Sequence, residues 1–179
     1  MHSIIVDLEA TCCDRNSIPK HAMEIIEIGA VAVRSEEGVP LSEFQAFVRP
    51  VRHPQLTAFC TQLTHIRQSD VDEARRFPEV VAQLRSWLTA FSPYEFCSWG
   101  DFDRQQMHQD CLFHHVGFPF AGPHRNLKLD FAAAQGKTKR VGVDGALQAL
   151  GWTFIGTAHR GIDDARNIAR IYRHLCGTR

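Results

Sequence analysis

The chain has 179 residues, 44% of them hydrophobic and 22% charged, and this ordinary composition predicts a single globular domain over residues 1–179. Its 20 basic and 20 acidic side chains balance, which argues against a protein that coats nucleic acid through a large positive excess. No segment approaches the ~18 consecutive apolar residues of a membrane span, and the first residues lack a signal-peptide pattern, so we expect a cytoplasmic protein with no membrane partner.

The first part of the chain reads as three strands. Residues 3–7 form a short apolar run that is typical of a strand buried on both faces. Residues 24–33 form a second strand rich in β-branched side chains, and residues 44–49 form a third that Pro50 ends. Turn residues at 36–38 separate the last two strands and predict an antiparallel hairpin.

The second part of the chain changes to a helical period. After Pro78, which suits the first position of a helix, apolar residues fall on one helical face. The remaining predicted elements are a strand at 94–99, helices at 102–115, 126–135 and 144–150, and a last helix whose apolar stripe begins at Ala165. Three strands followed by helices and a further strand predict an α/β domain with a mixed sheet.

Two carboxylates end the first predicted strand, in the segment IIVDLEATC. Side chains alternate along a strand, so Asp7 and Glu9 should face one side and Leu8 the other. Like charges this close repel, and one of them favours protonation unless a cation lies between them. Oxygen ligands without a nearby Cys/His set favour Mg²⁺ or Mn²⁺ over zinc. The alternative is a strand end at which both acids face water.

Two more acidic segments stand at the starts of predicted helices. In WGDFDRQQM, Asp101 and Asp103 compete: one can cap the helix while the other faces a cleft. In HRGIDDA, Asp163 and Asp164 present the same choice, with His159 beside them.

These acidic segments follow the first strand, follow the fourth strand and open the last helix. Binding sites in open α/β sheets lie beyond the carboxyl ends of strands, so we expect the acids to converge there. Such a set suits two divalent ions ~3.5–4 Å apart that clamp a phosphodiester. A neutral histidine beside them can take a proton from water at physiological pH.

The ordered motifs resemble those of the DEDDh 3′-to-5′ exonucleases of the RNase H-like fold. The family's Asp-x-Glu-x-Thr motif is matched by residues 7–11, and its His-x-x-x-x-Asp motif by residues 159–164. DLEATC followed by EIIEIGAV, and GIDDARNIARI near the end, are most similar to the Eri-type branch, which contains the histone-mRNA and small-RNA exonucleases.

The resemblance also settles the two open choices. In the Eri-type branch the middle Asp follows an aromatic residue, as Asp103 follows Phe102, which selects Asp103 over Asp101. The final Asp stands five positions after the His, which selects Asp164 over Asp163.

The resemblance implies a single-domain, RNase H-like mixed sheet flanked by helices. It implies a metal-dependent 3′-5′ exonuclease that hydrolyses phosphodiester bonds at the 3′ end of single-stranded nucleic acid, RNA more than DNA. It further implies two Mg²⁺ or Mn²⁺ ions held by Asp7, Glu9, Asp103 and Asp164, with His159 as general base. By the same analogy, the residues that contact the terminal nucleotide are Leu8, Ala10, Thr11, Leu63, Thr64 and Phe102, the last by stacking on a base.

Two positions depart from the family pattern. His65 stands where relatives often carry Gly, which puts the local backbone shape near the substrate in question. Gly161 stands where many relatives carry Ala, which we expect to be a mild change.

Three alternative functions remain at this stage: a catalytically idle nucleic-acid- or protein-binding module, a DNA-directed exonuclease, and a thiol or zinc site. A pure binder has no need of clustered, repelling acids. The thiol or zinc site would use Cys12, Cys13 and His21, but adjacent cysteines make poor joint ligands for one ion, and the six cysteines show no Cys-x-x-Cys spacing.

Overall fold

The computed structural model describes residues 1–15 and 17–177. Its centre is a six-stranded sheet with the strand order β4-β3-β2-β1-β5-β6. The strands are β1 (His2–Ala10), β2 (Ile25–Arg34), β3 (Pro40–Arg49), β4 (Arg75–Arg76), β5 (Tyr94–Ser98) and β6 (His124–Asn126). β1, β2 and β3 pair antiparallel, whereas β5 is parallel to β1 and β6 is parallel to β5. The predicted mixed sheet and the predicted hairpin are therefore confirmed.

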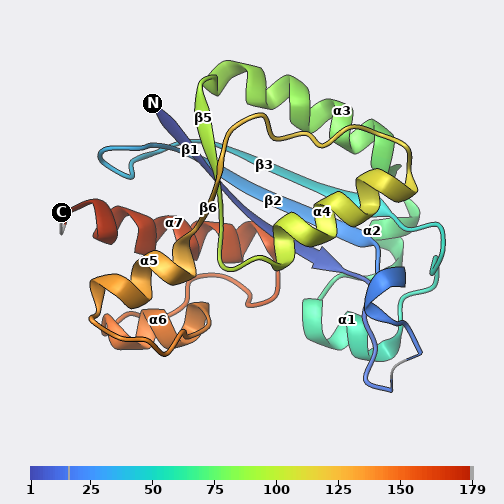
Figure 1. Ribbon diagram of the computed structural model, residues 1–179. Coiled ribbons are helices and arrows are strands. Elements are labelled where there is room, and N and C mark those ends of the chain that lie inside the picture. The colour runs from blue at the N-terminus through green and yellow to red at the C-terminus, as the bar shows by residue number, and fades with distance from the viewer. Residues whose placement is uncertain (16, 178–179) are drawn as a thin grey trace.

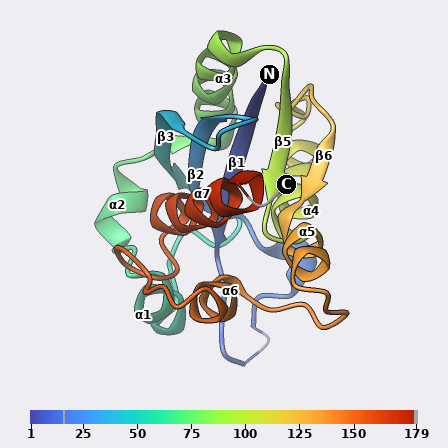
Figure 2. The same ribbon diagram turned by 90° about the vertical axis from the view of Figure 1, so that its left-hand side faces the viewer.

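Helices cover both faces of this sheet. They are α1 (Ala58–Thr64), α2 (Gln68–Asp72), α3 (Phe77–Leu88), α4 (Phe102–Phe113), α5 (Leu127–Ala134), α6 (Val143–Ala149) and α7 (Gly161–Gly177), with 3-10 turns at Lys20–Ala22 and Thr89–Phe91. Figures 1 and 2 show α7 lying across β1 and β2, with α5 and α6 beside it. No helix in the described part of the chain combines the length and the apolar character that a membrane crossing requires.

Two buried clusters divide the core between the faces of the sheet. Val6 on β1 packs with Met107 of α4 and with residues of α3 on one face. Ile5, the preceding residue, points the other way and packs with Leu127 of α5 and Ile168 of α7. This alternation along β1 decides which later side chains of the strand meet α7.

Several predicted boundaries were wrong by a few residues, and some short elements were not predicted. β1 continues to Ala10 and β3 begins at Pro40, because β2 supplies pairing partners as far as these two residues. The last helix begins at Gly161 rather than near Ala165, and α4 ends at Phe113. α2, β4 and β6 span five residues or fewer and are too short to display a hydrophobic period, and the seven-residue α1 was not predicted either.

Candidate active site

The two carboxylates of β1 lie on the face of the sheet that α7 covers. Leu8 is buried in the opposite core, so Asp7 and Glu9 face the same side, as predicted. In the antiparallel register Asp7 stands opposite Gly29, and Glu9 stands opposite Glu27. The neighbour of Asp7 on β2 is thus a residue without a side chain.

That missing side chain lets α7 approach the sheet closely. A Cβ atom at Gly29 would overlap the backbone of Gly161, the first residue of α7. A Cβ at Gly161 would in turn lie 3.0 Å from the carbonyl oxygen of Asp7 and 3.3 Å from the backbone nitrogen of Gly29. The first turn of α7 therefore rests directly on β1 and β2. An alanine at position 161 would be crowded by the backbone of Asp7 and Gly29, so the difference from relatives is less mild than the sequence predicted.

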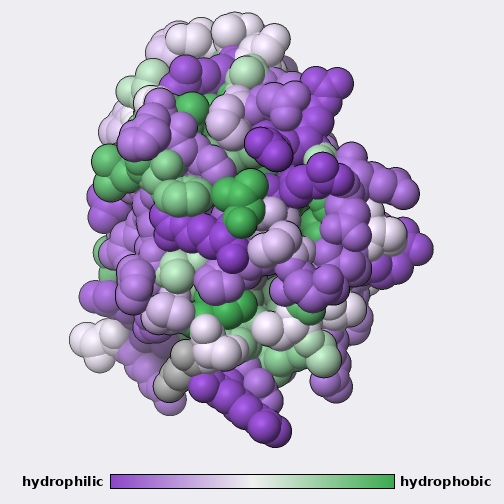
Figure 3. Space-filling model, turned by 90° about the vertical axis from the view of Figure 1, so that its right-hand side faces the viewer, coloured by the Kyte–Doolittle hydropathy of each residue, from purple (hydrophilic) through white to green (hydrophobic). Residues whose placement is uncertain are grey.

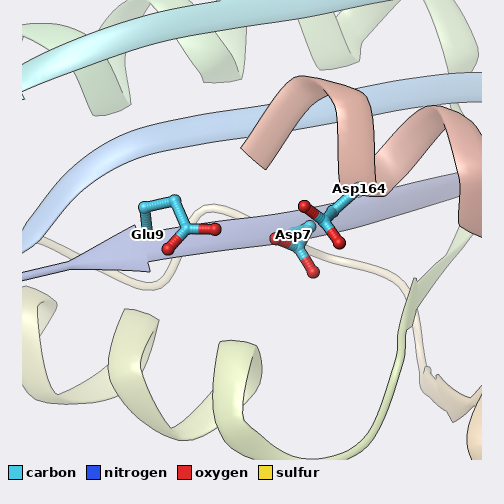
Figure 4. A group of neighbouring side chains, drawn as sticks. All are labelled: Asp7, Glu9 and Asp164. Atoms are coloured by element: carbon cyan, nitrogen blue, oxygen red, sulfur yellow. The ribbon is translucent and has the colours of Figure 1, made fainter. Parts of the chain in front are cut away.

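This close approach brings Asp164 of α7 to the β1 carboxylates. Ligand oxygens of Asp7, Glu9 and Asp164 all lie within 4.8 Å of one another (Figure 4). In the described part of the chain this is the one group of three or more His, Cys, Asp or Glu residues that could hold a metal ion. Cys12, Cys13 and His21 form no such group, so the thiol or zinc alternative has no geometric support.

Asp103 reaches the same strand from its other edge. The pairing of β1 with β5 ends at Val6 and Ser98, after which the chain turns into α4. The carboxylate of Asp103 then takes the place of a strand partner: its Oδ1 accepts a hydrogen bond from the backbone N–H of Leu8 at 3.0 Å. Asp103 is 4% exposed and lies outside the 4.8 Å group, but its charge contributes to the raised pKa of Asp7.

The neighbouring acids, Asp101 and Asp163, point away from this cluster. Asp101 is exposed and pairs with Arg104 at 3.2 Å. Asp163 accepts a hydrogen bond from the backbone N–H of Thr157 at 2.9 Å and pairs with Arg166 at 2.9 Å. Of the competing aspartates, Asp164 joins the group of three and Asp103 lies beside it on the N–H of Leu8.

The four carboxylates destabilise one another's charged forms. Burial, followed by the charges of Asp103 and Asp164, raises the pKa of Asp7 well above its ordinary value. Burial and the charge of Asp164 raise the pKa of Glu9 to about 9. Burial likewise raises the pKa of Asp103 and of Asp164 to about 7, although nearby backbone N–H groups oppose the shift at each carboxylate.

These observations fit a cation site. Oδ2 of Asp164 is buried and has no hydrogen-bond partner, and it is the one side-chain atom of that kind in the described residues. A buried charged oxygen without a partner is costly, and a cation relieves both that cost and the mutual repulsion. Because every donor in the group is a carboxylate, the site suits a hard divalent ion.

His159 stands in the loop just before α7. Its backbone is left-handed, with φ 60°, and its side chain is exposed. The backbone N–H of Asp164 donates to the carbonyl of Arg160 at 2.8 Å, so the conformation of this loop and the position of the acid are coupled. Left-handed backbone at a non-glycine residue stores strain that the surroundings must hold in place.

A buried ion pair that sequence reasoning missed holds this loop. Glu27 is 0% exposed, and its Oε2 accepts from Nε of Arg160 and from the backbone N–H of Gly161, both at 3.0 Å. Gln45 donates to its other oxygen at 3.0 Å. The available signal was a charged residue in the middle of the apolar run EIIEIGAV, where an acid needs a partner.

The residues predicted to contact the nucleotide differ in accessibility. Phe102 is 47% exposed at the start of α4, and Leu63 on α1 is half-buried. The other four side chains are buried: Leu8, Ala10, Thr11 and Thr64. The hydroxyls of both threonines bond to neighbouring backbone, Thr11 to the N–H of Glu24 and Thr64 to the carbonyl of Cys60. Contacts from these four residues to a nucleotide stay a prediction, and backbone atoms would have to make most of them.

His65 keeps the backbone conformation that a glycine would adopt. It caps α1 with φ 58° and ψ 16°, and its N–H donates to the carbonyl of Thr61 at 3.0 Å. Glycine is the usual residue at such a left-handed helix end because it lacks a Cβ. Histidine in place of glycine therefore raises the conformational free energy of this turn but leaves its backbone shape unchanged.

The family model RNase_T, described as an exonuclease, matches residues 4–172. The chain belongs to this exonuclease family. One relative is a probable 3′-5′ exonuclease, KapD of Bacillus subtilis, which is 32% identical over 171 residues, covering 95% of this chain and 82% of that protein. Another is the mouse ERI1 exoribonuclease 3, 34% identical over 181 residues; the match covers 96% of this chain but only 52% of that protein.

Solved structures of this exonuclease family have the same fold. The nuclease domain of 3′hExo, described as a DEDDh family member bound to rAMP, superposes with a TM-score of 0.87 at 30% identity, covering 97% of this chain and 90% of that one. A 3′-exonuclease described as recognising the 3′ end of a histone mRNA stem-loop has a TM-score of 0.88 at 28% identity, covering 98% of this chain and 63% of that one. The expected RNase H-like fold and the Eri-type resemblance are thus confirmed.

Proposed function

We propose that this chain is a single-domain, metal-dependent 3′-5′ exonuclease, with residues 1–179 forming the exonuclease domain. The observation that carries the proposal is the buried, unpartnered oxygen of Asp164 within 4.8 Å of ligand oxygens of Asp7 and Glu9. A module that only binds nucleic acid or protein gains nothing from acids that repel one another at such cost.

Asp7, Glu9, Asp103 and Asp164 would hold two Mg²⁺ or Mn²⁺ ions. When bound, such ions polarise the scissile phosphate, promote formation of a hydroxide nucleophile and stabilise the leaving oxygen. Asp103, anchored to the N–H of Leu8, supports the strand edge at which the other acids are displayed. The family's divalent-metal dependence leaves the choice between Mg²⁺ and Mn²⁺ open to measurement.

His159 would act as the general base. Its imidazole accepts a proton from the attacking water at one ring nitrogen, and its exposed position lets it pass that proton to solvent. The Glu27–Arg160 ion pair and the bond from Gly161 to Glu27 would orient the loop that carries this histidine.

We infer that the substrate is the 3′ end of single-stranded nucleic acid, with RNA preferred to DNA. Support comes from two relatives: one is named an exoribonuclease, and the other was solved with rAMP. The exposed ring of Phe102 would stack on a base, an interaction worth ~1–3 kcal/mol, and Leu63 would flank the terminal nucleotide. Leu8, Ala10, Thr11 and Thr64 would shape the pocket mainly through backbone.

Digestion of matched RNA and DNA oligonucleotides labelled at the 5′ end tests this proposal. We expect a ladder of shortened products with Mg²⁺ or Mn²⁺, none with EDTA, faster shortening of RNA, and a block by a 3′-phosphate. Asp7→Ala and His159→Ala should abolish the ladder while the circular dichroism spectrum is retained. Binding of RNA without any product in the presence of Mn²⁺ would instead support the idle-module alternative. The expected cytoplasmic location is a separate prediction, which fractionation of cells producing the chain tests.

A further inference from the structure

The exposed face of α4 leads away from the candidate active site. Phe102 opens the helix next to Asp103, and exposed side chains then recur at helical spacing at Gln105, His108 and Leu112. At ~1.5 Å per residue, the helix carries this face over about 18 Å. Leu112, at the far end, is 77% exposed.

Two adjoining hollows lie along this face. The inner hollow, of about 410 Å³, begins at Phe102 and is lined by Lys20. The outer hollow, of about 670 Å³, is lined by Arg52, Arg104, His108 and Phe113. Gln105 and Gln109 line both hollows, so the two are adjacent along the helix, and we call them together the α4 groove. Figure 3 looks onto the side of the molecule at which α4 ends, where hydrophilic residues surround smaller hydrophobic areas.

The α4 groove is positively charged although the chain as a whole is neutral. Lys20, Arg52 and Arg104 line it, and neither Asp nor Glu occurs among the described residues that line either hollow, although Arg104 also pairs with Asp101 beside the groove at 3.2 Å. Arg52 is held in place: its guanidinium lies 3.4 Å from the centroid of the Phe113 ring and donates to the carbonyl of His21 at 3.1 Å. Such a local excess of cations attracts a polyanion.

Flat rings accompany the cations. Phe102 presents a half-exposed ring at the inner end. Further along, the exposed imidazole of His108 lies parallel to Phe118, with 3.9 Å between centroids and 7° between planes. Cations that follow a backbone and rings on which bases stack are the two elements of single-strand binding grooves.

We propose that the α4 groove binds the part of the single strand that lies 5′ of the scissile bond. This proposal rests on the proposed function, because it takes the 3′ end to be at the acidic cluster. Single-stranded nucleic acid fits the groove better than a protein partner because cations and rings occur together and the inner end lies at Phe102, the residue before Asp103. At a stacked spacing of ~3.4 Å per nucleotide, the groove has room for about five nucleotides.

Two substrates and a matched pair of charge-reversed variants test the proposal. The substrates are an RNA dinucleotide, which can occupy only the active site, and an oligonucleotide longer than the groove. The groove variant carries Lys20→Glu and Arg104→Glu. The control carries Lys137→Glu and Lys139→Glu in the exposed loop between α5 and α6, so both variants make the same change in net charge.

For the groove variant, kcat/KM on the long oligonucleotide should fall by at least about tenfold relative to the control variant, whereas kcat/KM on the dinucleotide stays within about twofold. The dependence of log kcat/KM on log salt should also weaken by about 0.7 for each phosphate that the variant no longer neutralises. Equal reductions on both substrates would mean damage to the active site, and unchanged digestion of the long oligonucleotide would mean another strand path. Either result overturns the proposal.

Binding separates failure of this proposal from failure of the proposed function. Fluorescence anisotropy of the labelled long oligonucleotide in EDTA measures its binding to the protein in the absence of catalysis. If the wild-type chain digests neither substrate, the proposed function fails. Weaker binding by the groove variant, with unchanged binding by the control variant, would still support binding of the strand in the α4 groove. Equal binding by both variants would mean that the α4 groove does not bind the single strand, and the proposal would be wrong.

Discussion

At the scale of single residues, two adjacent aspartates in this structure have different roles. Asp164 joins the acidic cluster with an unpartnered oxygen, whereas Asp163 bonds to Thr157 and Arg166 on the other side of the turn. Asp164→Asn should therefore lower the rate of oligonucleotide digestion by on the order of 10²–10³-fold or more, because it removes a charge on which cation binding depends.

Asp163→Asn is the matched control, since it makes the same chemical change one position earlier. We expect it to retain most of the activity and to lose some stability with the Arg166 ion pair, an exposed interaction worth up to about 1 kcal/mol. In EDTA above neutral pH, Asp164→Asn should melt at the same temperature as wild type or higher, because the apo protein no longer carries that repelling charge. Loss of activity in both variants alike would contradict the assignment.

His65 allows a stability prediction at the same scale. A left-handed backbone costs an L-residue about 1–2 kcal/mol, and glycine avoids this cost while losing some entropy on folding. His65→Gly should therefore raise the free energy of unfolding by about 0.5–1 kcal/mol, measured by urea denaturation. His65→Ala keeps the Cβ and should give little or no gain, so equal stabilisation by both changes would show that backbone strain is not the cause.

Sequence reasoning identified the acids but could not choose among them from spacing alone. Asp101 and Asp103 both lie at a strand-to-helix boundary. They differ because Asp103 bonds to the N–H of Leu8, on the edge of β1 that β5 leaves unpaired beyond Val6. The unpaired edge exists because β5 ends there, and no local sequence pattern predicts how far that pairing extends. The family resemblance selected Asp103 over Asp101 instead. Glu27 was missed for a related reason: its partner, Arg160, lies at the other end of the chain.

At the scale of elements, the site depends on how closely α7 approaches β2. The long strands and amphipathic helices were predictable, because their periods repeat over enough residues. The contact between Gly29 and Gly161 was not, because a glycine in a strand indicates only that something approaches closely, and not which element does so.

Gly29→Ala tests this contact. The new methyl group would overlap the Gly161 backbone, so α7 must move away from the sheet, and we expect the protein to lose about 1–3 kcal/mol of stability or more. Activity should fall as well, because Asp164 moves with α7. Gly177→Ala, at the open far end of the same helix, has no atom within 4 Å of the new methyl group and should change stability by less than about 1 kcal/mol. A Gly29→Ala protein as stable and as active as the Gly177→Ala protein would contradict this account of the packing.

At the scale of the whole molecule, the acidic cluster joins segments that are distant in sequence. β1 supplies two carboxylates, the start of α4 supplies a third from the open edge of the sheet, and the start of α7 supplies the fourth from the covering layer. α4 packs in one core cluster, α7 packs in the other and β1 contributes to both, so the repulsion among the acids acts against the docking of α4 and α7 onto the sheet. A cation bound among them would therefore stabilise the tertiary fold and not only the local geometry.

Thermal unfolding with increasing Mn²⁺ tests that coupling. A ligand that binds only the folded state at a free concentration of about 100 times its Kd adds about 2.7 kcal/mol, which for a chain of this size corresponds to a rise in Tm of about 5–10 °C. We expect this rise in the wild-type protein and in Asp163→Asn, since Asp163 lies outside the 4.8 Å group. Asp164→Asn should show a much smaller rise, although its Tm in EDTA is not lower than that of wild type. Because the two variants differ by one position and carry the same net charge, an equal rise in both would mean that Mn²⁺ binds elsewhere on the molecule, and the two-ion mechanism would lose its structural basis.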